Sequence, residues 1–240
     1  MRTTERITLI PTYVLHQYDW RETSRLVEIF THDHGRLGLV ARGARRANSP
    51  WRAVLRPFQP LLLSWVGSGE LATLTAAEAG DGPHALSGRA LMSGFYMNEL
   101  LLRLLPRLDP QPELFGQYGH ALSRLTQAIA PALRLFEKHL LTALGYGLNL
   151  ERDAATGQPL ETDAVYRYEP EQGPVRILDA GGTGINIKGG TLLALASGDF
   201  QQPEQLRDVR HLLRTVLDEL LGGRPLRTRE VMRAFGKTQV

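Results

Sequence analysis

A cluster of breaking residues, Gly80-Asp81-Gly82-Pro83, separates two kinds of hydrophobic pattern in this chain. Before the cluster, short runs of β-branched and apolar residues predict strands; after it, apolar residues recur every three or four positions, which predicts helices. With 240 residues, the chain is long enough for one large domain or two to three small ones, each with its own apolar core. We therefore expect an α+β fold whose first domain ends near residue 80.

Five strands are expected before this cluster. They are residues 7–15, 25–31, 36–41, 59–66 and 70–77. Gly35 and Gly67-Ser68-Gly69 suit the turns of two hairpins, and Pro11 indicates an edge or a bulge in the first strand. Five short strands predict a small closed barrel, and an OB-like barrel is the leading candidate because it closes with that number.

The second part of the chain is expected to be mainly helical. Helices are predicted at residues 91–105, after Pro112, after Pro131, at 203–221 and from about 228 to 235. Glycine and proline are frequent from 148 to 190, so we expect an irregular insert there, with two short strands at 164–168 and 175–178. The predicted domains are an OB-like barrel (1–80), a helical bundle (81–147), the insert (148–190) and C-terminal helices that pack on the bundle (191–240).

Positive charge is concentrated near the start of the chain, although the net charge is only +3. The first 56 residues contain ten arginines and five acidic residues, and no acidic residue occurs between Asp33 and Glu70. A local excess of this kind is typical of proteins that bind polyanions.

The arginine-rich segment from Arg36 to Arg56 is the predicted DNA-binding site. Its side chains can bind phosphates in a bidentate manner, and a tryptophan among them can stack on bases. The candidate residues are Arg36, Arg42, Arg45, Arg46, Trp51, Arg52 and Arg56. The alternative is a solvated basic loop in a protein that uses 25 arginines and three lysines.

Catalytic and metal-binding chemistry finds little support in the sequence. The chain has no cysteine, which excludes disulfides, thiolate zinc sites and cysteine nucleophiles. The cluster His32-Asp33-His34 lacks further ligands at a recognisable spacing, so a polar turn is expected instead of a metal site. Glu99 is expected to accept hydrogen bonds within the bundle, because no nucleophile–base pair completes a catalytic set. We therefore expect no enzyme activity, no cofactor and no metal.

The glycine-rich stretch 181–191 resembles a phosphate-binding loop only superficially. It lacks the Gly-Lys-Ser/Thr ending of such loops, so a turn-rich loop is expected.

Two further basic segments leave alternatives open. Arg134, Leu135 and Lys138 lie on a predicted amphipathic helix, which suits either packing or an acidic peptide that ends in a carboxylate. The C-terminal arginines Arg227, Arg229 and Arg233 suit either packing on the bundle or contact with DNA.

The start of the chain has no apolar stretch of signal-peptide length, and nowhere do about 18 apolar residues run together. A cytoplasmic protein with no membrane partner is therefore expected.

Several short motifs, in this order and spacing, resemble those of the bacterial DNA repair protein family RecO. In the first part they include Tyr13-Val14-Leu15-His16, Leu39-Val40-Ala41-Arg42-Gly43-Ala44-Arg45 and Leu55-Arg56-Pro57-Phe58-Gln59-Pro60-Leu61. In the helical part they include Tyr96-Met97-Asn98-Glu99-Leu100, Leu144-Gly145-Tyr146-Gly147 and Pro225-Leu226-Arg227-Thr228-Arg229-Glu230. The segment 150–190 matches least.

The resemblance implies an OB barrel, a helical domain and a recombination mediator that is monomeric when free. Such proteins bind single- and double-stranded DNA, anneal complementary strands and, with RecR, load RecA onto DNA coated by single-stranded DNA-binding protein (SSB). The resemblance also implies that the acidic SSB tail docks near Arg134, Leu135 and Lys138. It further implies that the protein associates with the bacterial nucleoid during repair. Many relatives carry a four-cysteine zinc site in the insert, so this cysteine-free chain is expected to be a metal-free variant whose insert is held by packing alone.

Two other functions stay open at this point. One is an RNA-binding OB module of the translation machinery, which would contact the ribose 2′-hydroxyl. The other is an enzyme that uses Glu99 or the histidines at 32 and 34.

Overall fold

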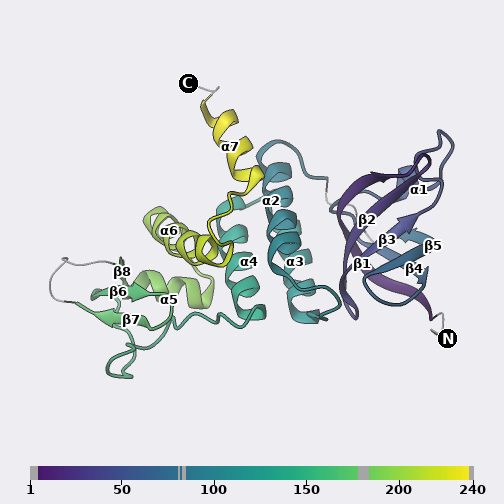
Figure 1. The fold of residues 1–240 in the computed structure, drawn as a ribbon. Helices are drawn as coiled ribbons and strands as arrows, with labels where there is room; N and C mark the ends of the chain where they lie inside the picture. Colours follow the sequence, from purple (N-terminus) through teal and green to yellow (C-terminus); the bar gives the residue numbers. More distant parts are fainter. Residues whose placement is uncertain (1–4, 81, 83–84, 178–183, 238–240) are drawn as a thin grey trace. The chain divides into compact units, whose positions relative to one another are not determined.

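The structure, a computed structural model, describes residues 5–80, 82, 85–177 and 184–237. The chain forms two compact units (Figure 1): unit 1 comprises Met1–Thr126 with Leu226–Val240, and unit 2 comprises Gln127–Pro225. This division differs from the four predicted segments, because the first two helices and the last one go with the barrel. Asp81 and Pro83 of the breaker cluster lie outside the described residues.

The strand-rich part of unit 1 is a closed five-stranded barrel, which confirms the predicted α+β class and the OB-like topology. Its strands are β1 (Arg6–Trp20), β2 (Ser24–Thr31), β3 (Gly35–Ala41), β4 (Leu61–Val66) and β5 (Leu71–Ala79). They follow the order β1-β2-β3-β5-β4, and β4 pairs with β1 to close the barrel. Every neighbouring pair is antiparallel except β3 and β5.

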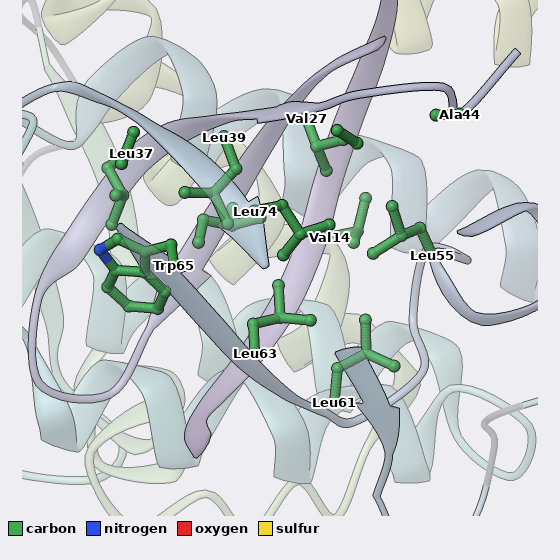
Figure 2. Packing of buried hydrophobic residues seen from close by; sticks show 13 residues of the cluster. Val14, Val27, Leu37, Leu39, Ala44, Leu55, Leu61, Leu63, Trp65 and Leu74 are labelled. Atoms are coloured by element: carbon green, nitrogen blue, oxygen red, sulfur yellow. The ribbon is translucent and has the colours of Figure 1, made fainter. Parts of the chain in front are cut away.

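Alternate side chains of all five strands fill the barrel. Figure 2 shows Val14, Leu39 and Trp65 among the side chains that meet in this interior. Ala44 and Leu55, from the segment that connects β3 to β4, are buried in the same core. That connection also contains the one-turn helix α1 (Trp51–Val54).

The first strand is longer than predicted. It was expected to end at Leu15, but β1 continues to Trp20 and forms a hairpin with β2 in which Trp20 lies opposite Ser24. Pro11 lies in β1 next to a register shift between Ile7 and Ile10, which confirms the predicted bulge. The barrel is closed, so β1 is not an edge strand.

Unit 1 is completed by α2 (Gly88–Leu104), α3 (Pro112–Arg124) and α7 (Arg227–Lys237). Asn98 of α2 donates from Nδ2 to the carbonyl oxygen of Leu15 at 2.8 Å, and Tyr118 of α3 donates to Asn98 Oδ1 at 2.6 Å. All the groups in this chain of hydrogen bonds are buried, so leaving one of them without its partner would cost about 1–3 kcal/mol. The barrel and these helices therefore form one unit.

A second buried contact joins the barrel to the segment between α2 and α3. Glu28 of β2 is 5% exposed and accepts hydrogen bonds from Arg36 of β3 and from Arg107. Arg36 also donates to the carbonyl oxygen of Leu105 at 3.0 and 3.1 Å. This cluster balances the buried carboxylate with two cations.

Unit 2 contains α4 (Ile129–Ala143), α5 (Gly189–Ser197) and α6 (Pro203–Leu220), which pack on one another. The insert forms a three-stranded antiparallel sheet of β7 (Gly173–Arg176), β6 (Val165–Glu169) and β8 (Ile185–Lys188). Strands β6 and β7 were predicted, with slightly different bounds, whereas β8 and α5 were not. Leu178 and the start of the glycine-rich stretch, residues 181–183, lie outside the described residues.

The insert is held by more than packing. Asp153 accepts backbone N–H hydrogen bonds from Ala155 (2.8 Å), Thr156 (3.0 Å) and Arg176 (3.0 Å). Burial raises the pKa of Asp153, but these hydrogen bonds lower it by more, so its pKa lies below the ordinary value. One carboxylate thus fastens the loop 153–156 to β7, which corrects the expectation of packing alone.

Among the helices that the structure describes, none is both long and apolar enough to cross a membrane.

Gly35 is predicted to be essential for the close contact between the β2–β3 turn and the segment that connects α2 to α3. Its φ is +64°, and a Cβ atom there would lie 2.2 Å from the carbonyl oxygen of Asp109. Gly35→Ala should lower the free energy of unfolding by about 2 kcal/mol or more, since the left-handed backbone alone costs about 1–2 kcal/mol and the clash adds to it. Urea unfolding, followed by circular dichroism, measures this loss.

Gly116 is the matched control for this substitution. It lies in α3, and a Cβ atom there would meet nothing within 4 Å. Gly116→Ala should therefore raise stability by roughly 0.5–1 kcal/mol. Equal effects of the two substitutions would contradict the role given to Gly35.

Asp153 makes the stability of unit 2 depend on pH. Its lowered pKa stabilises the fold fully above the pKa of unfolded Asp, about 3.9, and this contribution disappears as the pH falls through the lower folded value. Asp153→Asn should lower the Tm by about 3 °C or more at neutral pH, because an amide N–H would face the N–H of Arg176. The difference should shrink in acid; thermal unfolding at several pH values, with the exposed Asp163→Asn as control, tests this.

Candidate nucleic-acid interface

The loop that follows β3 displays the predicted arginines. The exposed ones on this β3–β4 connection are Arg42, Arg45, Arg46, Arg52 and Arg56. Ala44 is 2% exposed and packs in the barrel core, and the N–H of Arg45 donates to the carbonyl oxygen of Thr23 at 2.9 Å. The loop is therefore fixed to the barrel while its cationic side chains face solvent. We call these five residues the arginine loop.

Arg45 reaches across to the turn between β1 and β2. Its Nη1 donates to the carbonyl oxygen of Arg21 at 2.9 Å, and its Nε lies 3.5 Å from Oδ2 of Asp19. Both charged side chains are substantially exposed, so this ion pair contributes little to stability. The other four arginines of the loop have no ion pair within the described residues, which leaves their guanidinium groups available for phosphates.

Arg36 was predicted to bind DNA, but its side chain is engaged inside unit 1. It is 12% exposed and pairs with Glu28 at 3.3 Å while it donates to Leu105. Burial lowers its pKa, Arg107 lowers it further, and Glu28 opposes the shift. Arg36 therefore stabilises the fold, and we omit it from the candidate interface.

Trp51 is likewise used for packing. Its Nε1 donates to the carbonyl oxygen of Arg42 at 3.1 Å, and its half-buried ring packs against the barrel core. This position holds the arginine loop in place and argues against the predicted stacking on bases.

Two other aromatic side chains near the loop were not predicted as site residues. Tyr18 and Trp20, on β1, are 48% and 37% exposed. The alternation of His16, Tyr18 and Trp20 is a signal for one face of a strand, but it lies beyond the predicted end of the first strand.

The candidates for chemistry have structural roles in unit 1. Glu99 accepts hydrogen bonds from the backbone N–H groups of Arg227 and Thr228 and from the Thr228 hydroxyl, so it caps the N-terminus of α7. Burial raises the pKa of Glu99, but these hydrogen bonds and Arg103 lower it overall, whereas a general acid would need a raised pKa. Because α7 begins at Arg227, Thr228 is its second residue and donates to the capping carboxylate of Glu99.

The His32–Asp33–His34 turn holds no metal-type cluster. His32 Nδ1 lies 2.6 Å from Asp33 Oδ1, and the ring of His34 contacts Trp65. Within the described part of the chain, no group of three potential ligands that could hold a metal ion occurs.

The C-terminal arginines divide between packing and exposure. Arg229 donates to the hydroxyl oxygen of Tyr96 at 3.3 Å, and its guanidinium lies 5.5 Å from the centre of that ring. Arg227 and Arg233 have exposed side chains.

The predicted partner site lies on α4 of unit 2. Arg134 is buried and pairs with Glu137 at 2.8 Å, and Leu135 packs against Gly198 at the end of α5. Lys138 Nζ donates to the carbonyl oxygens of Leu195 (3.1 Å) and Ala196 (2.9 Å). Burial lowers the pKa of Lys138, and Glu151 partly offsets this. Since an ammonium group has three donors and two of them have acceptors among the described residues, the third is suited to a further acceptor.

Comparison with known proteins gives one consistent result. Two family profiles match the chain: "Recombination protein O N terminal" over residues 6–82 and "Recombination protein O C terminal" over residues 86–230. The chain is 48% identical to a protein named DNA repair protein RecO in Nitrosococcus oceani, over 95% of this chain and 93% of the relative. Proteins of the same name from Aromatoleum aromaticum and Alkalilimnicola ehrlichii are also 48% identical, over 95% and 98% of this chain and 96% and 94% of theirs.

Proposed function

The chain belongs to the RecO family of DNA repair proteins, and we propose that it is a recombination mediator that binds single- and double-stranded DNA and anneals complementary strands. The observation that carries this proposal is the arginine loop: five exposed cations fixed on one connection of an OB-like barrel. Family membership supports DNA repair over the RNA-binding alternative. In this role the protein makes and breaks no covalent bond.

The physical mechanism is electrostatic. Arginines of the loop neutralise phosphates and release condensed counterions, which supplies affinity without regard to base sequence. Two strands held on one cationic surface repel each other less, and base pairing then supplies the sequence match. Annealing follows from charge neutralisation combined with proximity.

The salt dependence of binding tests this mechanism. If about four arginines contact phosphates, log affinity for a single strand should fall against log salt with a slope of roughly −3. Arg42→Ala/Arg45→Ala/Arg46→Ala should weaken binding to all sequences equally and reduce the slope by about 2. Fluorescence anisotropy across a salt series measures both quantities.

The control for this variant replaces Arg207 and Arg210, two exposed arginines of α6 in unit 2. Arg207→Ala/Arg210→Ala should change the affinity and the slope little. A wild-type slope near zero, or a triple variant with unchanged affinity, would exclude the arginine loop. Annealing of SSB-coated complementary strands, with and without the protein, then tests the activity itself.

We further propose that the protein acts with RecR to load RecA, and that unit 2 binds the acidic SSB tail near Lys138. The family resemblance supports both partners, and the third donor of the Lys138 ammonium group is suited to the terminal carboxylate. Arg134→Glu is a poor test, since it would place a second carboxylate beside buried Glu137 and destabilise unit 2.

Lys138→Met tests the tail site, because it keeps most of the apolar stem and removes the charge. The variant should bind a labelled acidic peptide that ends in phenylalanine about tenfold more weakly or worse, as expected for a lost charged hydrogen bond. Lys188→Met, at an exposed lysine on β8, is the matched control. Equal affinities of Lys138→Met and wild type would move the tail site elsewhere.

A further inference from the structure

The outer face of the β1–β2 hairpin packs on the rest of unit 1 along one half, and among the described residues its other half is exposed to solvent. At the far end of β2, Phe30 contacts Phe115 of α3, with ring centres 5.4 Å apart, and Glu28 pairs with Arg107. At the near end, Tyr18 lies opposite Leu26, and Trp20 lies opposite Ser24. Tyr18 and Trp20 are exposed, so the open half of this face carries two aromatic rings.

The pleat of β1 places these rings outside the barrel. Gln17 lies opposite Val27, which is buried in the core, so residues 18 and 20 point the other way. His16 follows the same alternation, and its ring lies 4.4 Å from that of Tyr18. Three ring-bearing residues therefore share one outward face of β1.

The neighbouring strands extend this face with flat apolar surface. Gly38 of β3 pairs with Leu71 of β5, and a Cβ atom on Gly38 would lie 3.3 Å from a methyl group of Leu71 and 3.4 Å from one of Leu26. Because position 38 has no side chain, Leu26 and Leu71 approach each other over it. Leu71 is 49% exposed, so this apolar surface is open to solvent.

The open half lies at the same end of the barrel as the arginine loop. The N–H of Arg45 donates to Thr23, in the turn that directly follows Trp20. The side chain of Arg45 contacts Asp19, the residue between the two rings, and the carbonyl oxygen of Arg21. Cations for phosphates and rings for bases thus meet at one turn.

We propose that Tyr18 and Trp20 form a stacking platform for unpaired bases of single-stranded DNA. This proposal rests on the proposed function and adds the chemistry by which single strands are distinguished. Residues two apart on a strand are spaced at about 6.6 Å, roughly twice the 3.4 Å rise per stacked nucleotide, so each ring can take one base of an extended strand. In a duplex the bases are stacked inside and paired, so of these two features only the arginine loop can contribute to duplex binding.

The charge of the site favours a nucleic acid as the occupant. Exposed arginines beside exposed rings suit a ligand that carries both phosphates and free planar bases. A duplex offers only the phosphates, and an acidic peptide offers no row of bases. A single strand is the ligand that uses both features.

The experiment compares the double variant Tyr18→Ala/Trp20→Ala with wild type on three ligands. They are a thymidine oligonucleotide of about 16 nucleotides, an abasic oligonucleotide with the same number of phosphates, and a duplex. Since a base–aromatic stack accounts for roughly fivefold to 150-fold in affinity, the variant should bind the thymidine strand at least about tenfold more weakly. Its affinity for the abasic strand and the duplex should stay within about twofold of wild type.

Two further variants test whether the effect is specific to the rings at positions 18 and 20. Tyr146→Ala removes a tyrosine that is 54% exposed in unit 2 and should leave thymidine binding unchanged. Trp20→Phe keeps a ring and should retain most of the affinity, while it removes the quenching of indole fluorescence by thymidine that we expect of Trp20. Circular dichroism of Trp20→Phe also shows whether this position tolerates substitution.

The outcomes separate the two proposals. Equal weakening of thymidine and abasic binding, or no weakening of either, overturns the stacking platform while DNA binding by the arginine loop stands. Unchanged indole fluorescence on thymidine binding also overturns it. A wild-type protein that binds none of the three ligands overturns both proposals.

Discussion

The buried carboxylate of Glu28 is the constraint on which the arrangement of unit 1 depends. A charge in the wall of a small barrel is tolerated only when cations pair with it, and here Arg36 and Arg107 both do so. Since Arg107 belongs to the connection between two helices, folding of the barrel and docking of that connection are coupled. The hydrogen bonds from Tyr118 to Asn98 and from Asn98 to the backbone of β1 make a second attachment. The first family profile ends at residue 82, but the compact unit extends to residue 126 and includes the C-terminal helix.

This coupling also divides the outer surface of the barrel. The half around Glu28 and Phe30 packs against Arg107 and α3. The half around Tyr18 and Trp20 is exposed beside the arginine loop. The same strands thus serve stability at one end and, in our proposal, recognition at the other. The loop itself is held by Ala44, which is buried in the barrel core, and by Trp51, which packs against that core. Within the described residues, Arg45 is the one arginine of the loop with an ion pair, so phosphates would have to displace only the contact with Asp19.

Local patterns were sufficient to predict the barrel, because alternation within strands and glycines at turns are encoded in neighbouring residues. The helices α2, α3, α4 and α6 could be predicted for the same reason. The role of Arg36 could not, since its partners Glu28, Leu105 and Arg107 meet it only in the folded chain. The segment 16–20 lacks the apolar run of a buried strand, because the outward-facing rings are themselves exposed, and β1 was therefore predicted too short. In the insert, β8 is only four residues long, and it is a strand because it pairs with β6. Neighbouring residues in the sequence give no indication of this pairing.

Asp153 has a consequence for the conditions under which unit 2 can keep its shape. Many relatives are expected to hold their insert with zinc and thiolates, whereas here a carboxylate that accepts from three backbone N–H groups fastens the loop 153–156 to β7. Oxidants eject zinc by attacking its thiolate ligands, and chelators remove it directly, but a carboxylate that accepts N–H hydrogen bonds offers neither of them a target. The whole chain contains no cysteine. A repair protein built in this way presents no thiolate–metal site in its insert to the oxidants that damage DNA.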